Sequence, residues 1–338
     1  MDQSGSVLAD WLGQSRRALA QGAASRSSAA SEPALHDGLL QHLGQALAAG
    51  RVEIFVLHTR WLAETLAARH GSRVAVRELL LALREELEHA VPAAAWPRVR
   101  AAFTAALDGL ETVQPPVDSL LRDGAPRVEL ARRYLLAVLE ARLDDAVRLV
   151  LDAAQGGASI EELIAEVVIP VQQELGRMWQ CGEASVAEEH LASQVAARLL
   201  TLLDAQATRA PRRERRILVA CVEGNDHDFG ARLLASAFER QGWQAILLGA
   251  NTPAAELATA VEQFQPDLIA LSAGTALHVR ATAATVAAIR ARAPGRTPIL
   301  VGGGAFAAVQ GLWRDVGADG TAADAASALA WARESSAR

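Results

Sequence analysis

The stretch Ile217–Val222 (ILVACV), followed at once by Glu223–Gly230 (EGNDHDFG), decides the fold of this chain. An unbroken apolar run with β-branched members is typical of a strand whose two faces are both covered, as in a parallel sheet. The polar residues that follow indicate a loop, and Gly230 lies where a helix can begin close to a ligand. The stretch therefore predicts a strand, a loop and a helix, which is the repeating unit of a parallel α/β fold.

Three more short apolar runs follow, with helical stretches between them. They are Ala245–Leu248, Leu268–Leu271 and Ile299–Val301. This alternation predicts a flavodoxin-like (Rossmann-like), doubly wound parallel sheet over residues 215–338. Ligands bind at the carboxyl ends of the strands in such sheets, so the loop 223–230 is expected at the binding edge.

Two helical blocks precede the sheet, in residues 35–114 and 125–206, where apolar residues recur at helical spacing. Prolines at the end of the first block, in Gln114-Pro115-Pro116, mark a boundary because proline ends helices. In the second block, Ser159 and Ser185 are each followed three residues later by a glutamate, which predicts two capping boxes. We expect an all-helical N-terminal domain and then a four-helix bundle.

Two other segments are expected to connect these parts. Residues 1–34 predict a short helix that holds Trp11, joined flexibly to the rest through the small polar residues 22–34. The basic run Arg209–Arg216 predicts a linker, since no aromatic or helix-turn-helix pattern accompanies it. The expected fold class is therefore multidomain, α and α/β.

The composition excludes several classes of protein. A net charge of −6 over 338 residues gives no electrostatic footprint for nucleic acid. The two cysteines, Cys181 and Cys221, are far apart, so neither a disulfide framework nor a structural zinc site is indicated. No apolar run reaches the roughly 18 residues of a membrane span, and no signal-peptide pattern is present. A cytoplasmic protein without a membrane partner is expected.

Motifs of common enzymes are also missing from the sequence. No nucleophile elbow, phosphate-binding loop or zinc-protease motif occurs. Gly302–Ala307 satisfies the dinucleotide pattern G-x-G-x-x-A, but it follows the fourth strand and not the first, so we discount it. We expect no enzymatic activity.

His227 is the candidate metal ligand in the polar loop. A histidine there can present one imidazole nitrogen to a metal while an oxygen fixes the other nitrogen. The alternative is an ordinary loop histidine that only forms hydrogen bonds. Neighbouring strand ends favour the ligand: Ser272–Thr275 (SAGT) is small and hydroxyl-bearing, and Gly302–Gly304 lacks side chains, which leaves room for a large planar group.

These residues resemble the cobalamin (vitamin B12) binding domain of methionine synthase, corrinoid carriers and cobalamin-dependent light sensors, over about residues 215–335. The family pattern is Asp-x-His-x-x-Gly, then Ser-x-Leu, then Gly-Gly. The matching residues here are Asn225, His227, Gly230, Ser272, Gly302 and Gly303. The resemblance implies that His227 is the lower axial ligand of cobalt and displaces the nucleotide base, which then lies beside the serine and the glycines.

Two positions depart from this pattern. Asn225 replaces an acidic residue, so the His227 imidazole keeps a hydrogen-bond acceptor but loses a negative partner, which makes it a weaker donor to cobalt. Gly274 stands where leucine is usual, which loosens the expected packing around the nucleotide tail. The cofactor-binding residues expected in this domain are Asn225, Asp226, Phe229, Gly230, Ser272, Gly274, Thr275, Gly302 and Gly303.

A second resemblance lies in the bundle, where nine residues separate Trp179 from Glu189-His190. This looks like the Trp-x9-Glu-His signature of adenosylcobalamin-dependent photoreceptors, which implies that the three side chains lie above cobalt and shield the adenosyl group. The alternative is a core tryptophan and an ordinary surface pair. Gln180 stands where some of these sensors have a histidine that captures cobalt after photolysis, so a bis-histidine lit state is either absent or formed by His190.

The N-terminal helical block is rich in histidine and tryptophan. These residues either line a tetrapyrrole pocket or are scattered surface histidines and core tryptophans. The block does not resemble the helix-turn-helix module of light-sensing transcription factors, and a helical domain in this place is similar to the photocobilins, which pair cobalamin with biliverdin. With no cysteine before Cys181, a biliverdin here would be held noncovalently or through another residue type. The residues are His36, His42, His58, His70, His89, Trp61 and Trp96.

The resemblances together predict a light sensor that uses adenosylcobalamin, in which photolysis of the cobalt–carbon bond rearranges the domains and changes the oligomeric state. The expected partners are further copies of this chain, with light-dependent assembly, or a regulatory protein, without direct nucleic-acid contact. Two alternatives stay open. One is a corrinoid carrier protein for a methyltransferase system, and the other is a light-independent cobalamin-responsive regulator.

Overall fold

The computed structural model of the chain forms two compact units. The described residues are 3–26, 33–70, 74–111, 118–292 and 297–335. Unit 1 combines residues 1–63, 72–113 and 211–338, and unit 2 combines residues 64–71 and 114–210. The sequence predicted separate parts in chain order, whereas the structure groups the N-terminal helices with the α/β domain although about 100 residues separate them in the chain.

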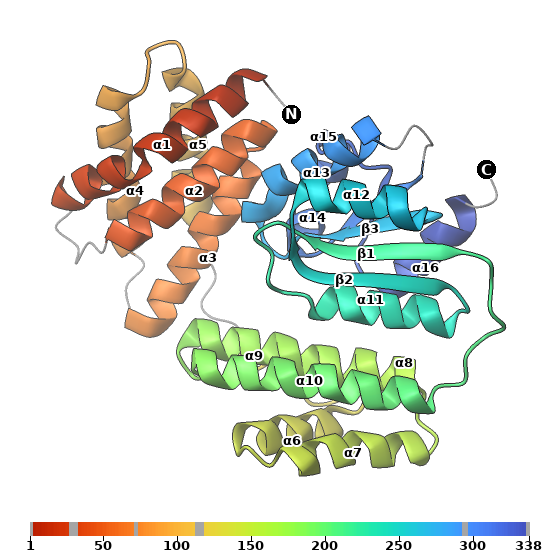
Figure 1. The fold of residues 1–338 in the computed structure, drawn as a ribbon. Helices are drawn as coiled ribbons and strands as arrows, with labels where there is room; N and C mark the ends of the chain where they lie inside the picture. The colour runs from red at the N-terminus through yellow and green to blue at the C-terminus, as the bar shows by residue number, and fades with distance from the viewer. Residues whose placement is uncertain (1–2, 27–32, 71–73, 112–117, 293–296, 336–338) are drawn as a thin grey trace. The chain divides into compact units, whose positions relative to one another are not determined.

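A five-stranded parallel sheet forms the centre of the α/β domain, with the order β2-β1-β3-β4-β5 (Figure 1). This order is that of flavodoxin-like folds and confirms the predicted class. The short strand β5 was not predicted, because Gly-Thr-Ala offers no apolar run. The strands are β1 (Arg216–Val222), β2 (Gln244–Thr252), β3 (Leu268–Ser272), β4 (Ile299–Gly302) and β5 (Gly320–Ala322).

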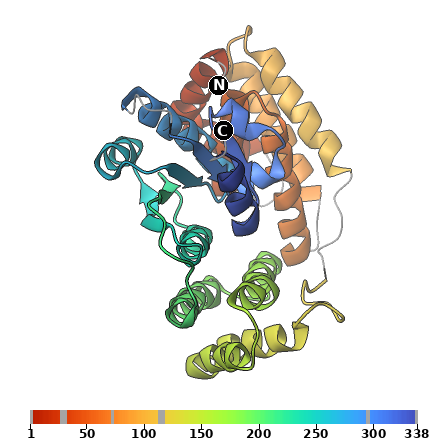
Figure 2. The ribbon, with the colours of Figure 1, turned by 90° about the vertical axis from the view of Figure 1, so that its right-hand side faces the viewer.

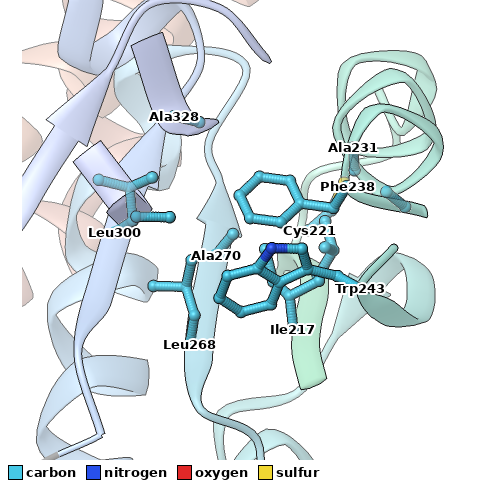
Figure 3. Packing of buried hydrophobic residues seen from close by; sticks show 12 residues of the cluster. Ile217, Cys221, Ala231, Phe238, Trp243, Leu268, Ala270, Leu300 and Ala328 are labelled. Carbon is cyan, nitrogen blue, oxygen red and sulfur yellow. The ribbon is translucent and has the colours of Figure 1, made fainter. Parts of the chain in front are cut away.

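Helices cover both faces of the sheet. One face packs against α11 (Phe229–Arg240) and α16 (Ala325–Ser335). Figure 3 shows the apolar core there, in which the Phe238 and Trp243 rings meet edge to face at 5.2 Å. The helices α12 (Ala254–Phe264) and α13 (Val279–Arg292) contact β1 and one another. Short helices complete the domain: η2 (Ala276–His278), α14 (Gly304–Ala308) and α15 (Leu312–Asp315).

The N-terminal part of unit 1 is entirely helical over its described residues, as the sequence predicts. Its first helix is longer than expected and extends to Arg26, since the alanine-rich start of the segment 22–34 favours helix. Leu8, Leu12 and Leu19 of this helix are buried. The predicted break at residues 114–116 lies outside the described residues. The helices are α1 (Gln3–Arg26), α2 (Pro33–Ala49), α3 (Glu53–His70), α4 (Val74–Ala90) and α5 (Trp96–Leu110).

The N-terminal helices join the α/β domain through α2, which contacts both η2 and α13. The backbone N–H of Arg280 donates to the Gln45 side chain at 3.1 Å. Arg51 pairs with Asp315 at 2.7 Å, with both side chains about 30% exposed. These contacts link residues far apart in sequence, so sequence periodicity could not show them.

Unit 2 contains the predicted bundle, drawn in yellow and green in Figure 2. Both predicted capping boxes are present, at Ser159 and Ser185. The long helix that reaches Trp179 contains a π-helical stretch just before Pro170, whose missing N–H disturbs the regular hydrogen bonds. The helices are α6 (Val128–Leu139), α7 (Leu143–Gln155), α8 (Ile160–Leu163), η1 (Ile164–Val168), α9 (Ile169–Cys181) and α10 (Val186–Gln206).

None of the helices in the described ranges is long and apolar enough to cross a membrane.

Candidate functional site

Asn225 organises the loop that follows β1. Its side chain is fully buried, and its Nδ2 donates to the Ser272 carbonyl at the end of β3 at 3.0 Å. Its Oδ1 accepts the backbone N–H of His227 at 3.2 Å. We expected Asn225 to act on the His227 imidazole, but the structure shows it acting on the His227 backbone. An amide can do both jobs at once because it carries a donor and an acceptor, which a carboxylate does not.

The His227 side chain is exposed at the carboxyl edge of the sheet, as the sequence predicts. Its backbone carbonyl accepts a weak hydrogen bond from the Cys221 thiol at 3.7 Å. Across the described part of the chain, no protein group is hydrogen-bonded to either nitrogen of the His227 ring. The backbone of this residue is therefore held in place while its imidazole stays available to a ligand.

His278 is a residue of this edge that the sequence did not reveal. It is buried, its Nδ1 accepts the N–H of Thr275 at 3.2 Å, and its Nε2 donates to the Gly224 carbonyl at 3.1 Å. It thus ties the loop after β3 to the loop that carries His227. Burial lowers the pKa of His278, although the hydrogen bond to Gly224 acts in the opposite direction. The only feature of the sequence that could have indicated His278 is its position a few residues after the end of a strand.

Gly274 and Asn225, the two departures from the family pattern, lie against one another. A Cβ added at Gly274 would lie 2.9 Å from Oδ1 of Asn225 and 3.5 Å from Cβ of His227. A larger side chain in this backbone would therefore displace the amide that holds the His227 backbone. The two departures from the family pattern, Asn225 and Gly274, are therefore linked by direct packing.

The three glycines at the end of β4, Gly302–Gly304, have a role in backbone packing. A Cβ at Gly303, whose φ is +97°, would lie 2.5 Å from the Ala273 carbonyl oxygen. The equivalent atom at Gly304 would lie 2.6 Å from the Gly274 oxygen, and at Gly302 it would lie 2.9 Å from the Ala322 oxygen. Neighbouring backbone therefore occupies the space that a side chain would need at these three positions, and this packing by itself requires glycine there.

The remaining expected residues of this domain lie around the same edge. Asp226 and Thr275 are exposed, and Phe229 is half-buried at the start of α11. A Cβ at Gly230 would meet nothing within 4 Å. Ser272 is half-buried and hydrogen-bonds to the thiol of Cys221, a residue whose pKa burial raises to about 11.

In unit 2, the predicted bundle residues lie at one end of an antiparallel helix pair. Trp179 is half-buried in the last turn of α9, and Glu189 and His190 lie in the first turns of α10. The Glu189 carboxylate accepts from Nδ1 of His190 at 2.7 Å and from the Ser193 hydroxyl at 3.0 Å. In the neutral ring with the proton on Nδ1, which this contact favours, Nε2 of His190 carries the lone pair that a ligand would need.

Of the N-terminal histidines whose side chains the structure describes, only His89 is exposed. His36 and His42 are buried, and the ring of His42 stacks on that of His58 at 3.4 Å with 5° between the planes. The Trp61 ring also stacks on that of His58, with 5.9 Å between the ring centroids and 21° between the planes. Burial lowers the pKa of His42, and burial followed by the neighbouring His42 lowers the pKa of His58 to about 3. Both rings are therefore neutral near pH 7.

The other aromatic and histidine residues of this block do not join the stack. His89 is exposed and bonds to the Glu85 carbonyl at 2.8 Å. Trp96 begins α5 and is half-buried. The side chain of His70 lies outside the described residues. The expectation of core tryptophans does not hold for Trp61, which is 37% exposed.

Comparison with known proteins gives matches for two regions of the chain, and each of them contains some of the candidate residues. Residues 215–330 match a family model described as a B12 binding domain, and residues 130–204 match a second model with the same description. The monomethylamine corrinoid protein of Methanosarcina barkeri shares the fold, with a TM-score of 0.56 over 62% of this chain and all of that chain, at 16% identity.

Two curated proteins of Myxococcus xanthus are similar in sequence. The HTH-type transcriptional repressor CarH is 32% identical over 185 residues, which are 54% of this chain and 61% of that protein. The HTH-type transcriptional repressor CarA is 35% identical over 179 residues, which are 53% of this chain and 59% of that protein. The chain therefore spans about three fifths of the length of each relative. It contains a B12 binding domain in residues 215–330, preceded in residues 130–204 by a region that matches the second B12 binding model.

Proposed function

We propose that this chain is a light sensor that binds adenosylcobalamin, with His227 as the lower axial ligand to cobalt. The observation that carries the proposal is the state of His227 in a B12 binding domain. Its backbone is fixed through Asn225, its ring is exposed, and its loop is tied to the next one by His278. These features suit a histidine that must reach a ligand without losing its position.

The metal-ligating side chains available here also fit a metal ion that is already bound in a macrocycle. Within the described ranges, no group of three or more His, Cys, Asp or Glu side chains could hold a metal ion by itself. A single axial histidine suffices when a corrin ring supplies the four equatorial nitrogens. Asp226, Phe229, Gly230, Ser272, Gly274, Thr275, Gly302 and Gly303 are proposed to line or shape the surroundings of the cofactor, the glycines by letting the loops approach.

The bundle residues are proposed to act on the upper side of the corrin. Trp179 would pack against the adenosyl group, and the Glu189–His190 pair would present Nε2 of His190 to that side. When bound, adenosylcobalamin supplies a cobalt–carbon bond that visible light breaks. Trp179 would lose this packing partner without the adenosyl group, so the preferred arrangement of the protein would differ between the two states of the ligand.

The output is proposed to be regulatory and not enzymatic, in a cytoplasmic setting. This rests on the two Myxococcus xanthus relatives, which are named as transcriptional repressors. We propose that light changes the association of this chain with further copies of itself or with a regulatory protein, without direct contact to nucleic acid.

The test is reconstitution of the chain with adenosylcobalamin, followed by absorbance spectra and light scattering before and after green light. A sensor is expected to retain the cofactor, and its absorbance spectrum and the mass of its assembly are expected to change after illumination. A corrinoid carrier would retain the cofactor and keep its mass in light, and a light-independent regulator that binds cobalamin weakly or not at all would not retain the cofactor. The matched pair is His227→Ala and His89→Ala, since both histidines are exposed. Unchanged cofactor retention and dark spectrum in His227→Ala would refute the axial ligand.

Biliverdin in the N-terminal helices is a second proposal, supported by the stack of His42, His58 and Trp61. The two uncharged imidazoles and the indole are flat aromatic rings, and such rings can stack on a flat conjugated ligand that is bound without a covalent bond. Chain produced together with a biliverdin source is expected to show a far-red band, and His58→Leu is expected to weaken it. If the wild-type chain shows no far-red band, this second chromophore is excluded.

A further inference from the structure

Arg69, near the end of α3, contacts the end of α9 in three ways. Its Nε donates to the Gln180 carbonyl at 3.1 Å, and its Nη2 donates to the Trp179 carbonyl. Its Cζ lies 5.1 Å from the centroid of the Trp179 indole. All of these residues belong to unit 2, which includes residues 64–70 of α3. The tryptophan proposed to face the adenosyl group is therefore held by a residue 110 positions away in sequence.

The chemistry of the contact suits arginine in particular. The last carbonyls of a helix have no partner within the helix and carry the negative end of its dipole, so a cation there is favourable. A planar guanidinium can donate to two carbonyls in a fork and also attract an indole ring, which a lysine ammonium does less well. A Cβ at Gly182, which ends α9, would lie 3.5 Å from Cγ of Arg69, so the stem of this arginine also packs closely.

Helix α3 connects this contact to the N-terminal helices. It runs without interruption from Glu53 to His70 and contains neither glycine nor proline, so it has no sequence feature that would kink it. His58, Thr65 and Arg69 are spaced by 7 and 4 residues, which places them on one stripe of the helix. His58 is the residue that stacks on His42 of α2. A shift at one end of the stripe is therefore expected to reach the other.

We propose that Arg69 is a positioning residue for Trp179 and that, through α3, it couples the upper side of the cobalamin site to the His42–His58 stack. The coupling of Arg69, Trp179 and α3 is a property of the protein alone. Its use as a light signal rests on the proposed function.

The first test uses the cofactor-free full chain and hydrogen exchange of the amides of residues 53–63. Trp179→Leu is expected to raise their exchange by about threefold, Arg69→Gln by the same factor, and the double variant by no more than the larger single effect. Arg60→Gln, on the same helix and without these contacts, is the matched control and is expected to leave the rates within about 1.5-fold. Unchanged rates in Trp179→Leu, or multiplied effects in the double variant, would overturn the coupling.

The second test adds adenosylcobalamin and green light. In the wild-type chain, light is expected to change the exchange of residues 53–63. In Arg69→Gln the absorbance spectrum of the cofactor should still change in light, but the light-dependent change in exchange of residues 53–63 should fall to less than about a third of the wild-type change. The change in Arg69→Lys should lie between those of the wild type and Arg69→Gln. Because Arg69 is exposed, these variants leave no buried cavity, and circular dichroism verifies their fold.

The two tests separate this inference from the proposed function. If the wild-type spectrum does not change in light, the light sensor is refuted and the cofactor-free variants still decide the coupling. If the spectrum converts and α3 responds equally in the wild type and Arg69→Gln, the role of Arg69 is refuted and the light sensor stands.

Discussion

At the scale of single residues, the edge of the sheet depends on how closely two loops approach each other. Asn225, His278 and Gly274 hold the loop after β1 against the loop after β3. His227 projects from this assembly as the one member with an exposed imidazole. A ligand can therefore be bound by a residue whose backbone is already ordered, which reduces the entropy cost of binding.

Gly274→Ala is expected to destabilise unit 1 by about 1–3 kcal/mol, because the new methyl group must displace the Asn225 amide. Gly230→Ala is the control, since a Cβ there meets open space, and its effect should stay within about 0.5 kcal/mol. Urea denaturation measures both. Equal effects of the two variants would show that the 2.9 Å approach to Asn225 is relaxed without cost.

Gly303→Ala is expected to cost more than about 3 kcal/mol, because strain at φ +97° adds to a collision with the Ala273 carbonyl. Gly50→Ala isolates the strain, since Gly50 also has a positive φ, of +67°, but has open space around it. That variant should cost about 1 kcal/mol. A similar urea midpoint for both variants would contradict the assignment of Gly303 to backbone packing.

At the scale of elements, helix ends carry the proposed upper-side residues. The capping box at Ser185 begins α10, which presents Glu189 and His190 within its first turns, and the Gly182 cap ends α9 just after Trp179. Helix ends fray unless their free backbone groups are satisfied. The caps therefore fix the positions of these three side chains.

Ser185→Ala is expected to destabilise unit 2 by about 1 kcal/mol and to loosen the first turn of α10. Ser159→Ala removes the other capping box and should cost a similar amount. The two variants should differ in function: only Ser185→Ala is expected to alter the adenosylcobalamin spectrum after illumination. Spectra that change equally in both would mean that overall stability, and not the Glu189–His190 turn, is responsible.

At the scale of the whole molecule, the division into units does not follow chain order. The N-terminal helices and the sheet form one unit, joined where α2 contacts η2 and α13. The helix η2 ends in His278, which bonds to the loop of His227. Events in the N-terminal helices and at the edge of the sheet are therefore expected to share one unfolding transition.

Acid is expected to destabilise unit 1 through the His42–His58 stack. Burial holds the pKa of both rings below 6.5, to about 3 for His58, so the unfolded chain binds protons that the folded chain does not. The contribution of these neutral histidines to the free energy of unfolding is thus complete above pH 6.5, and it falls as the pH drops from 6.5 toward 3. Urea midpoints of the sheet transition between pH 7 and 5 measure this. His58→Leu should flatten the dependence, and His89→Gln should leave it unchanged.

The sequence by itself determined the fold class, the helical blocks, both capping boxes and the position of His227 at the edge of the sheet. These features depend on apolar periodicity and on contacts a few residues apart, which a sequence shows directly. Only the tertiary structure decided what Asn225 binds, why Gly302–Gly304 are glycines, and how His278 and Arg69 contribute. Each of these depends on which loops or helix ends meet after folding, across about 20 to 110 residues of chain, and no local pattern encodes that.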